Sequence, residues 1–163
     1  PWHGLQVAED AGTYAGRPNA RVCLYFETLT RENGALRVIP GSHRRPFADH
    51  LQDLWSEEDD PGDKAFGASS TELPCVVLES EPGDVVVFTE TVYHGSFGGT
   101  ARLQLTAQFG ANPTTEEVRD LRKLHDKFSW SLHPHAAYIS SDRPRIRRMV
   151  SRLVELGFTP MKV

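Results

Sequence analysis

The sequence is poor in cysteine, and its two cysteines, Cys23 and Cys75, lie far apart inside apolar runs. This spacing excludes the disulfide framework of a small secreted protein and the closely spaced pair of a redox motif. We expect both to be buried free thiols in a reducing compartment. No run approaches the ~20 apolar residues of a membrane span, and nothing at the start has a signal-peptide pattern. The sequence therefore predicts a cytoplasmic protein with no membrane partner.

An excess of positive charge is also missing. The chain has 18 basic and 22 acidic residues, a net charge of −4 and a pI near 6.0. Nucleic acids and anionic surfaces bind basic faces, so neither is expected as a main partner. Local charge runs, acidic at residues 56–60 and basic at residues 143–152, are interpreted as solvated faces. With 163 residues the chain is long enough for one domain with a real core.

Strand-like runs separated by turns dominate the first two thirds of the chain. They cover residues 21–26, 35–39, 73–80, 84–88 and 102–109. Asn33-Gly34 and Gly98-Gly99 are hairpin signals, and Val85-Val86-Val87-Phe88 predicts a strand buried on both faces. Leu103, Leu105 and Ala107 alternate with polar residues, which predicts a half-buried strand.

The character of the chain changes after residue 113. Thr114 and Glu117 form a capping box that opens a helix to about Phe128, and Asp142 is expected to cap a last helix that ends near Gly157. The pattern predicts a mainly β protein, an antiparallel sandwich or barrel, with C-terminal helices. We interpret residues 1–163 as a single domain, with a core at 1–113 and a helical region at 114–163.

One stretch brings possible chemistry together. It reads as the strand Val85–Phe88, then His94, then a glycine turn, then Arg102, so an imidazole and a guanidinium are expected at one end of a sheet. Of the seven histidines, His3 and His94 flank the sheet region and are predicted to converge at one mouth of a barrel. Two imidazoles with one carboxylate and open positions suit a non-haem Fe(II) site.

The sequence also resembles a known family. Residues 33–43 (NGALRVIPGSH), 82–88 (PGDVVVF) and 94–102 (HGSFGGTAR) are similar, in this order, to the motifs of the phytanoyl-CoA dioxygenase (PhyH-like) family, and Trp2-His3 resembles the start of its Trp-His-x-Asp motif. The resemblance covers roughly residues 1–113. It implies a double-stranded β-helix (jelly-roll, cupin-like) oxygenase that uses Fe(II), 2-oxoglutarate and molecular oxygen on a small-molecule substrate.

The resemblance also implies roles for particular residues. His3 and His94 would ligate the metal, and Arg102 and Ser96 would hold the distal carboxylate of 2-oxoglutarate. An arginine fork binds a carboxylate through two hydrogen bonds and stays charged at any working pH, which suits that role. Because the chain opens on Pro1-Trp2-His3, in what looks like the middle of a domain, we expect a preceding segment.

One position departs from the family pattern: Leu5 stands where the motif has its metal-binding aspartate. A leucine cannot ligate a metal, so three interpretations stay open. Glu9 or Asp10 supplies the oxygen, or the vacant position takes water or a halide as in related halogenases, or the protein is a catalytically silent jelly-roll binding protein. The leading hypothesis is an oxygenase that hydroxylates or otherwise oxidises an aliphatic carbon.

Two further features concern the substrate. Residues 44–73 form a long segment, with one short helix expected near residues 47–55, and are interpreted as a lid whose aromatic residues line an apolar pocket. Arg37 either faces the pocket and selects an acid or lies at the surface. The sequence predicts neither the substrate itself nor an oligomeric state.

Overall fold

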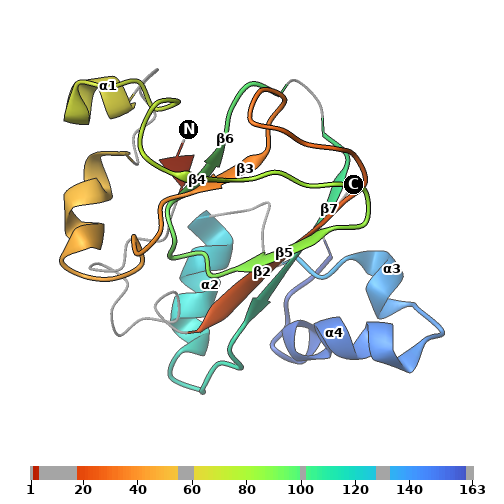
Figure 1. Cartoon of the computed structure of the whole chain (residues 1–163). Coiled ribbons are helices and arrows are strands. Elements are labelled where there is room, and N and C mark those ends of the chain that lie inside the picture. The colour runs from red at the N-terminus through yellow and green to blue at the C-terminus, as the bar shows by residue number, and fades with distance from the viewer. Residues whose placement is uncertain (1, 4–17, 55–60, 100–101, 128–132, 161–163) are drawn as a thin grey trace. The chain divides into compact units, whose positions relative to one another are not determined.

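The computed structural model describes residues 2–3, 18–54, 61–99, 102–127 and 133–160 (Figure 1). The residues up to Ala111 form one compact unit and those from Asn112 onward form a second, so each is described by itself. The described part of the first unit is mainly β, and the strand pairs within it are antiparallel.

Within the described residues, seven strands of the first unit form two sheets. One sheet has the order β1-β6-β3-β4 and the other β5-β2-β7. Their bounds are β1 Trp2–His3, β2 Asn19–Tyr25, β3 Leu36–Val38, β4 Val76–Leu78, β5 Val85–Phe88, β6 His94–Ser96 and β7 Gln104–Gly110. From β2 onward the chain changes sheet at every connection except the one from β3 to β4.

The two glycine turns do not form the expected hairpins. Asn33-Gly34 joins β2 to β3 and Gly98-Gly99 joins β6 to β7, and in both cases the two strands belong to different sheets. The turns themselves are present, with positive φ at Gly34 (107°) and Gly98 (88°). A turn signal records a reversal of the chain, but the strand that pairs afterwards is selected by long-range packing.

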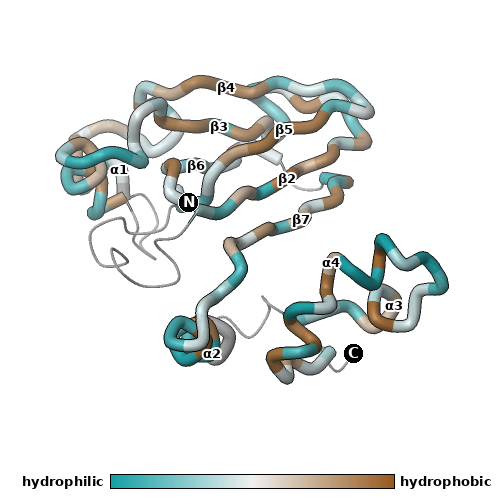
Figure 2. Tube along the Cα trace, turned by 90° about the horizontal axis from the view of Figure 1, so that it is seen from below, coloured by the Kyte–Doolittle hydropathy of each residue, from teal (hydrophilic) through white to brown (hydrophobic). Residues whose placement is uncertain are grey.

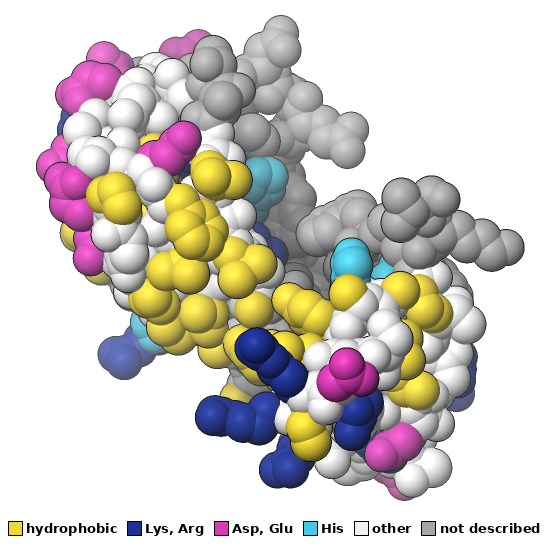
Figure 3. Space-filling model, turned by 90° about the vertical axis from the view of Figure 1, so that its right-hand side faces the viewer, with side chains coloured by type: hydrophobic (Ala, Val, Ile, Leu, Met, Phe, Trp, Pro, Cys, Tyr) yellow, Lys and Arg dark blue, Asp and Glu magenta, His cyan; other side chains and the backbone are white. Residues whose placement is uncertain are grey.

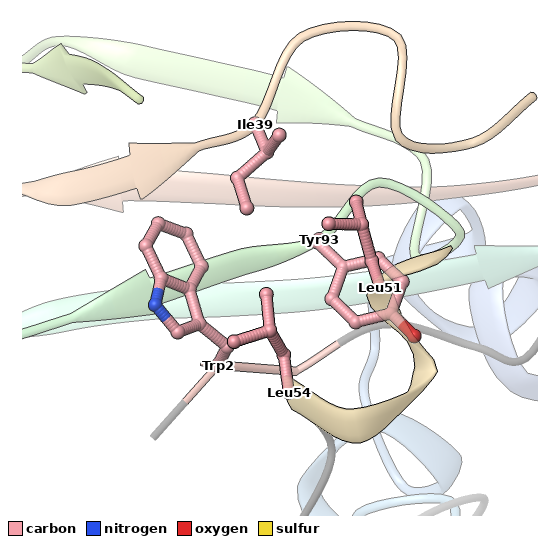
Figure 4. Close-up of a cluster of buried hydrophobic side chains, with 5 residues drawn as sticks. All are labelled: Trp2, Ile39, Leu51, Leu54 and Tyr93. Carbon is pink, nitrogen blue, oxygen red and sulfur yellow. The ribbon is translucent and has the colours of Figure 1, made fainter. Parts of the chain in front are cut away.

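The hydrophobic core of the four-stranded sheet lies between β1, the end of β3 and a 3-10 helix, η2 (Phe47–Leu54). Its buried side chains are Trp2, Ile39, Leu51, Leu54 and Tyr93 (Figure 4). A second core of Cys23, Tyr25, Leu29 and Ala35 lies on the inner face of β2 and in the turn that follows. Both cysteines are free, as predicted; Cys23 is buried and Cys75 half-buried.

The expectation that Val85–Phe88 is buried on both faces is wrong. The strand is brown along its whole length in Figure 2, yet Val85 is 54% and Val87 61% exposed. Leu103 and Leu105 of the last strand region are 62% and 51% exposed, so the predicted half-buried face of that strand is wrong too. The physical reason is that Val85, Val87 and Leu105 lie on the outer face of the three-stranded sheet, whose side chains are all apolar and are exposed on β5 at both outward positions. Exposed hydrophobic side chains are visible on the face of the molecule that Figure 3 turns to the viewer.

The second unit contains helices α2 (Val118–Lys127), α3 (Ala136–Ile139) and α4 (Pro144–Glu155). Thr114 and Glu117 exchange the hydrogen bonds of a capping box before α2. The expected cap at Asp142 is wrong, because α4 takes Arg143 as its N-cap without a side-chain bond and starts on Pro144. No helix that the structure describes is long and apolar enough to cross a membrane.

Candidate active site

Strand β6 places two polar side chains on one face of its sheet. It is only three residues long, and alternation puts His94 and Ser96 on one face and Gly95 on the other. β1 pairs on one side of it and β3 on the other, so β6 is an inner strand. Pairing on both sides fixes the backbone that carries both side chains.

His3 and His94 are direct cross-strand partners. The register of β1 against β6 pairs the two residues, and their ring centroids lie 6.2 Å apart with an angle of 51° between the planes. Directly opposed residues of antiparallel strands project from the same face. The predicted convergence of these two histidines is therefore what the structure contains.

The His94 ring is held in one orientation. Its Nδ1 lies 2.7 Å from the carbonyl oxygen of Val92, which can only accept a hydrogen bond, so Nδ1 carries the proton. The edge of the ring also meets Phe88, with centroids 4.8 Å apart. In the neutral ring Nε2 then keeps its lone pair, which is the form that ligates metals.

Burial keeps both imidazoles neutral. The pKa of His94 is lowered to about 4, chiefly by burial and also by the nearby charge of Arg21, against an opposing effect of the Val92 hydrogen bond. The pKa of His3, the more exposed of the two, is also lowered, chiefly by burial, with the Arg21 charge contributing. Since a metal binds only unprotonated imidazole, both rings are in the competent state at neutral pH.

Arg102 lies against the other end of β6. Its Nη1 donates to Ser96 Oγ at 2.5 Å and to the carbonyl oxygen of Gly34 at 3.1 Å. The side chain passes so close to Gly34 that an added Cβ there would lie 3.3 Å from Arg102 Cδ. Within the described residues, Nε and Nη2 of this exposed guanidinium make no hydrogen bond, so one edge of the fork is open to a carboxylate.

The connection before His94 is anchored by a buried serine. Ser42 is fully buried, and its Oγ accepts a hydrogen bond from the Tyr93 N–H at 2.8 Å. The carbonyl of Tyr93 in turn accepts from the Ile39 N–H at 2.9 Å. The Pro-Gly-Ser-His stretch thus supports His94 through the Ser42 side chain, which holds the backbone of the preceding residue. His43, the last residue of the stretch, accepts a hydrogen bond from the Arg44 guanidinium.

No third ligand is found among the residues that the structure describes. They contain no group of three or more histidine, cysteine, aspartate and glutamate side chains placed to hold a metal. Leu5, Glu9 and Asp10, on which the sequence interpretations of the missing carboxylate depend, lie outside the described residues. The donor set that is present, two neutral imidazoles side by side, suits a divalent transition metal.

Arg37 belongs to neither of its two expected places. It pairs with Gly95, so it lies on the face of the sheet opposite His94, and it is 5% exposed. Its guanidinium donates to the carbonyls of Thr71 and Arg31 at 2.6 and 3.0 Å and stacks over the Phe97 ring. Arg37 therefore has a structural role, since its buried guanidinium links β3 to the backbone at Thr71 and Arg31. The strand register decides on which face of the sheet it lies.

The described part of residues 44–73 does not form the expected lid. Leu51 and Leu54 pack with Trp2, which alternates with His3 and so lies on the opposite face of the sheet. Phe47 and Phe66 are exposed, and Trp55 lies outside the described residues.

Sequence reasoning missed a buried ion pair near the two histidines. Arg21 Nη2 donates to Glu90 Oε2 at 3.0 Å, and Arg21 Nε contacts Glu90 Oε1. Glu90 is 7% exposed, and burial raises its pKa, against the lowering effect of Arg21. Arg21 is a charged residue in a strand-like run, but its partner Glu90 is far away in the sequence, so no local pattern indicates the pair.

The model of the phytanoyl-CoA dioxygenase family matches residues 3–102, which is more than half of the chain and includes both histidines and Arg102. The chain belongs to this family. It is 31% identical over 91 residues to a probable phytanoyl-CoA dioxygenase of Caenorhabditis elegans, covering 54% of this chain and 29% of that protein. It is 31% identical over 124 residues to the dioxygenase FrzG of Cladobotryum sp, covering 73% of this chain and 32% of that protein.

Among solved structures, EctD from S. alaskensis with 2-oxoglutarate and 5-hydroxyectoine is similar at 24% identity, covering 68% of this chain and 38% of that chain, with a TM-score of 0.42. The chain spans about a third of the length of the curated relatives that it matches.

Proposed function

We propose that this chain forms the iron- and 2-oxoglutarate-binding core of an oxygenase that hydroxylates or otherwise oxidises an aliphatic carbon of a small metabolite. The observation that carries the proposal is the arrangement around β6, where His94 and Ser96 share one face, His3 lies beside His94 and Arg102 binds Ser96. Membership of the dioxygenase family supports it.

A double-stranded β-helix, the jelly-roll of the cupin type, is the proposed fold. In such a fold the chain passes repeatedly from one sheet to the other, and the two sheets face each other. The alternation of sheets from β2 to β7 supports this architecture. The site would then lie on the inner faces, because Phe88 of the three-stranded sheet contacts His94 of the other sheet.

The protein's own residues would bind and orient. His3 and His94 would hold Fe(II) through neutral ring nitrogens, and the Val92 carbonyl fixes the proton of His94 on Nδ1, which leaves Nε2 able to ligate. Arg102 and Ser96 would hold the distal carboxylate of 2-oxoglutarate through charge-assisted hydrogen bonds. When bound, the iron would activate molecular oxygen, which is the oxidant, and 2-oxoglutarate would supply two electrons.

A second candidate function is a catalytically silent binding protein. It is favoured by the lack of a third metal-binding side chain among the described residues and by Leu5 at the expected aspartate position. Such a protein would keep the Arg102 and Ser96 carboxylate site but would not couple 2-oxoglutarate decay to oxidation.

Ligand-dependent heat stability and turnover test the two functions separately. Fe(II), added without oxygen, and 2-oxoglutarate should each raise the melting temperature of the wild-type protein. At a hundredfold excess over Kd, either ligand should add about 2.7 kcal/mol to the free energy of unfolding. His94→Ala should abolish the metal shift and Arg102→Ala the 2-oxoglutarate shift. His50→Ala and Arg44→Ala, at exposed positions, are the matched controls.

Unchanged shifts in both site variants would contradict the assignment of the site. Succinate release from 2-oxoglutarate in air then separates enzyme from binding protein. Binding without succinate, with or without a panel of amines, acids and acyl thioesters, would favour the silent protein.

A further inference from the structure

Arg21 faces the candidate active site from the opposite sheet. It lies on β2 and pairs with Phe88 of β5, so the two side chains share a face of the three-stranded sheet. The Phe88 ring contacts the ring of His94. That face therefore looks toward the histidines, and the Arg21 charge is close enough to lower the pKa of both His3 and His94.

The guanidinium of Arg21 is fixed along one edge only. Nε and Nη2 engage the two carboxylate oxygens of Glu90, which is the side-on form of an arginine–carboxylate pair. A guanidinium has a second edge, formed by Nη1 and the remaining proton of Nη2. Within the described residues Nη1 makes no hydrogen bond, and the Arg21 side chain is 24% exposed while that of Glu90 is 10% exposed.

The backbone of Glu90 is tied to the strand that carries Arg21, which restricts the plane of the paired guanidinium. The Glu90 N–H donates to Asn19 Oδ1 at 2.8 Å, and the neighbouring Thr89 hydroxyl donates to the same oxygen at 3.2 Å. Asn19 is two residues before Arg21 on the same strand. A preorganised fork loses little conformational entropy when a second carboxylate binds, which favours tight binding.

The neighbours of Arg21 on the inner face of the three-stranded sheet are polar on the side of β7. Gln108 is its cross-strand partner on β7, and Thr106 and Gln104 follow along the same face. Gln108 and Thr106 are exposed and Gln104 is half-buried. Amide and hydroxyl groups beside an open guanidinium edge fit a ligand that carries polar groups around a carboxylate, rather than a bare hydrocarbon.

We propose that Arg21 is a second carboxylate-binding residue of this site, separate from Arg102, and that it selects a substrate bearing a carboxylate. The inference rests on the proposed function for the identity of the site. The same chemistry has a second source, because 2-oxoglutarate carries a carboxylate at its oxo-acid end as well as the distal one assigned to Arg102. The experiment must therefore separate a substrate carboxylate from that of the cosubstrate.

Binding to the wild-type protein and to Arg21→Gln, measured by calorimetry, makes this separation. One arm titrates 2-oxoglutarate in the presence of Mn(II). The other titrates small carboxylates against their own primary amides (succinate and succinamide, hexanoate and hexanamide, L-proline and L-prolinamide), with and without 2-oxoglutarate and metal. Arg45→Gln, which removes an exposed arginine that also pairs with a carboxylate, is the matched control.

We expect the wild-type protein to bind at least one carboxylate tenfold more tightly than its amide, about 1.4 kcal/mol, and Arg21→Gln to lose this preference. If 2-oxoglutarate affinity stays within twofold, the carboxylate belongs to the substrate. If Arg21→Gln weakens the binding of 2-oxoglutarate at least tenfold, the carboxylate that Arg21 binds belongs to the cosubstrate. If 2-oxoglutarate affinity is unchanged and no carboxylate is preferred over its amide, the proposal is wrong.

Glu90→Gln distinguishes recognition from a purely structural ion pair. It keeps the guanidinium and removes the charge of its partner, so carboxylate preference should persist. An equal loss of carboxylate preference in Glu90→Gln and Arg21→Gln would overturn the proposal. If Arg21→Gln does not fold, Arg21→Lys replaces it in the same measurements, because lysine keeps the charge but lacks the planar fork. If the wild-type protein binds neither metal nor 2-oxoglutarate, only the proposed function is refuted. The titrations of carboxylates and amides in the absence of metal and 2-oxoglutarate still test the role of Arg21.

Discussion

Acidification of the metal-free protein should destabilise it through His94. Burial lowers the pKa of this histidine from its ordinary 6.5 to about 4, whereas the unfolded chain keeps the ordinary value. Between these two pH values the unfolded state binds a proton that the native state does not. The free energy of unfolding therefore falls as the pH falls from 6.5 to about 4.

The size of this effect follows from the same difference. One pH unit between native and unfolded pKa corresponds to about 1.4 kcal/mol, so His94 alone accounts for a loss of about 3 kcal/mol between neutral pH and pH 4. This is a large share of the total stability of a typical domain, about 5–15 kcal/mol. The loss is complete once the pH lies below the native pKa.

Urea titrations of the protein freed of metal with a chelator, repeated across this pH range, measure the effect. His94→Gln cannot take up the proton, so its stability should fall less, and the difference between the two proteins should shrink by about 3 kcal/mol. His50→Gln, at an exposed histidine, should follow the wild-type protein. Parallel curves for the wild-type protein and His94→Gln would show that the reasoning about this buried ring is wrong.

Three further changes probe the supports of the site. Ser42→Ala leaves the buried Tyr93 N–H without its acceptor, which should cost about 1–3 kcal/mol in urea unfolding. Gly98→Ala places a Cβ 2.3 Å from the backbone oxygen of Glu32, at a positive φ, and should cost at least about 1–3 kcal/mol. Trp2→Ala empties the core beneath β1, costs about 3–5 kcal/mol, and should reduce the metal-dependent melting shift because His3 follows Trp2.

Matched controls separate these causes. Gly83→Ala has a similar positive φ but no atom within 4 Å of the added Cβ, so an equal cost would rule out the clash at Gly98. Ser140→Ala removes an exposed hydroxyl bonded to a backbone carbonyl and should cost little, since water replaces it. Phe66→Ala, at an exposed aromatic residue, should leave the metal shift intact.

Local sequence signals located turns and strands well but not their pairing. Asn33-Gly34 and Gly98-Gly99 do reverse the chain, yet each reversal leads into another sheet. Nothing in a turn motif tells whether the next strand pairs with the previous one. Likewise the apolar run Val85–Phe88 is typical of a buried strand, and only the assembled sheet shows that Val85 and Val87 lie on its exposed outer face.

The candidate site was predicted where family motifs exist and missed where they do not. The pairing of His3 with His94 could be expected from the resemblance, since both belong to its motifs. The Arg21–Glu90 pair belongs to none of the motifs and joins residues far apart in sequence, so no local pattern could reveal it. The face on which Arg37 lies depends on strand register, which only the assembled sheet determines.

The alternation of sheets also has a consequence for how the protein is made. Cys23 of β2 pairs with Val86 and with Thr106, both synthesised long after it, so β2 has no partner when it leaves the ribosome. Folds dominated by such distant pairings close long loops before they gain contacts, and they fold slowly. His3 is synthesised long before His94 and meets it only when β6 joins the sheet. We therefore expect metal to bind after the sheets have assembled, as the last step of maturation rather than as a template for it.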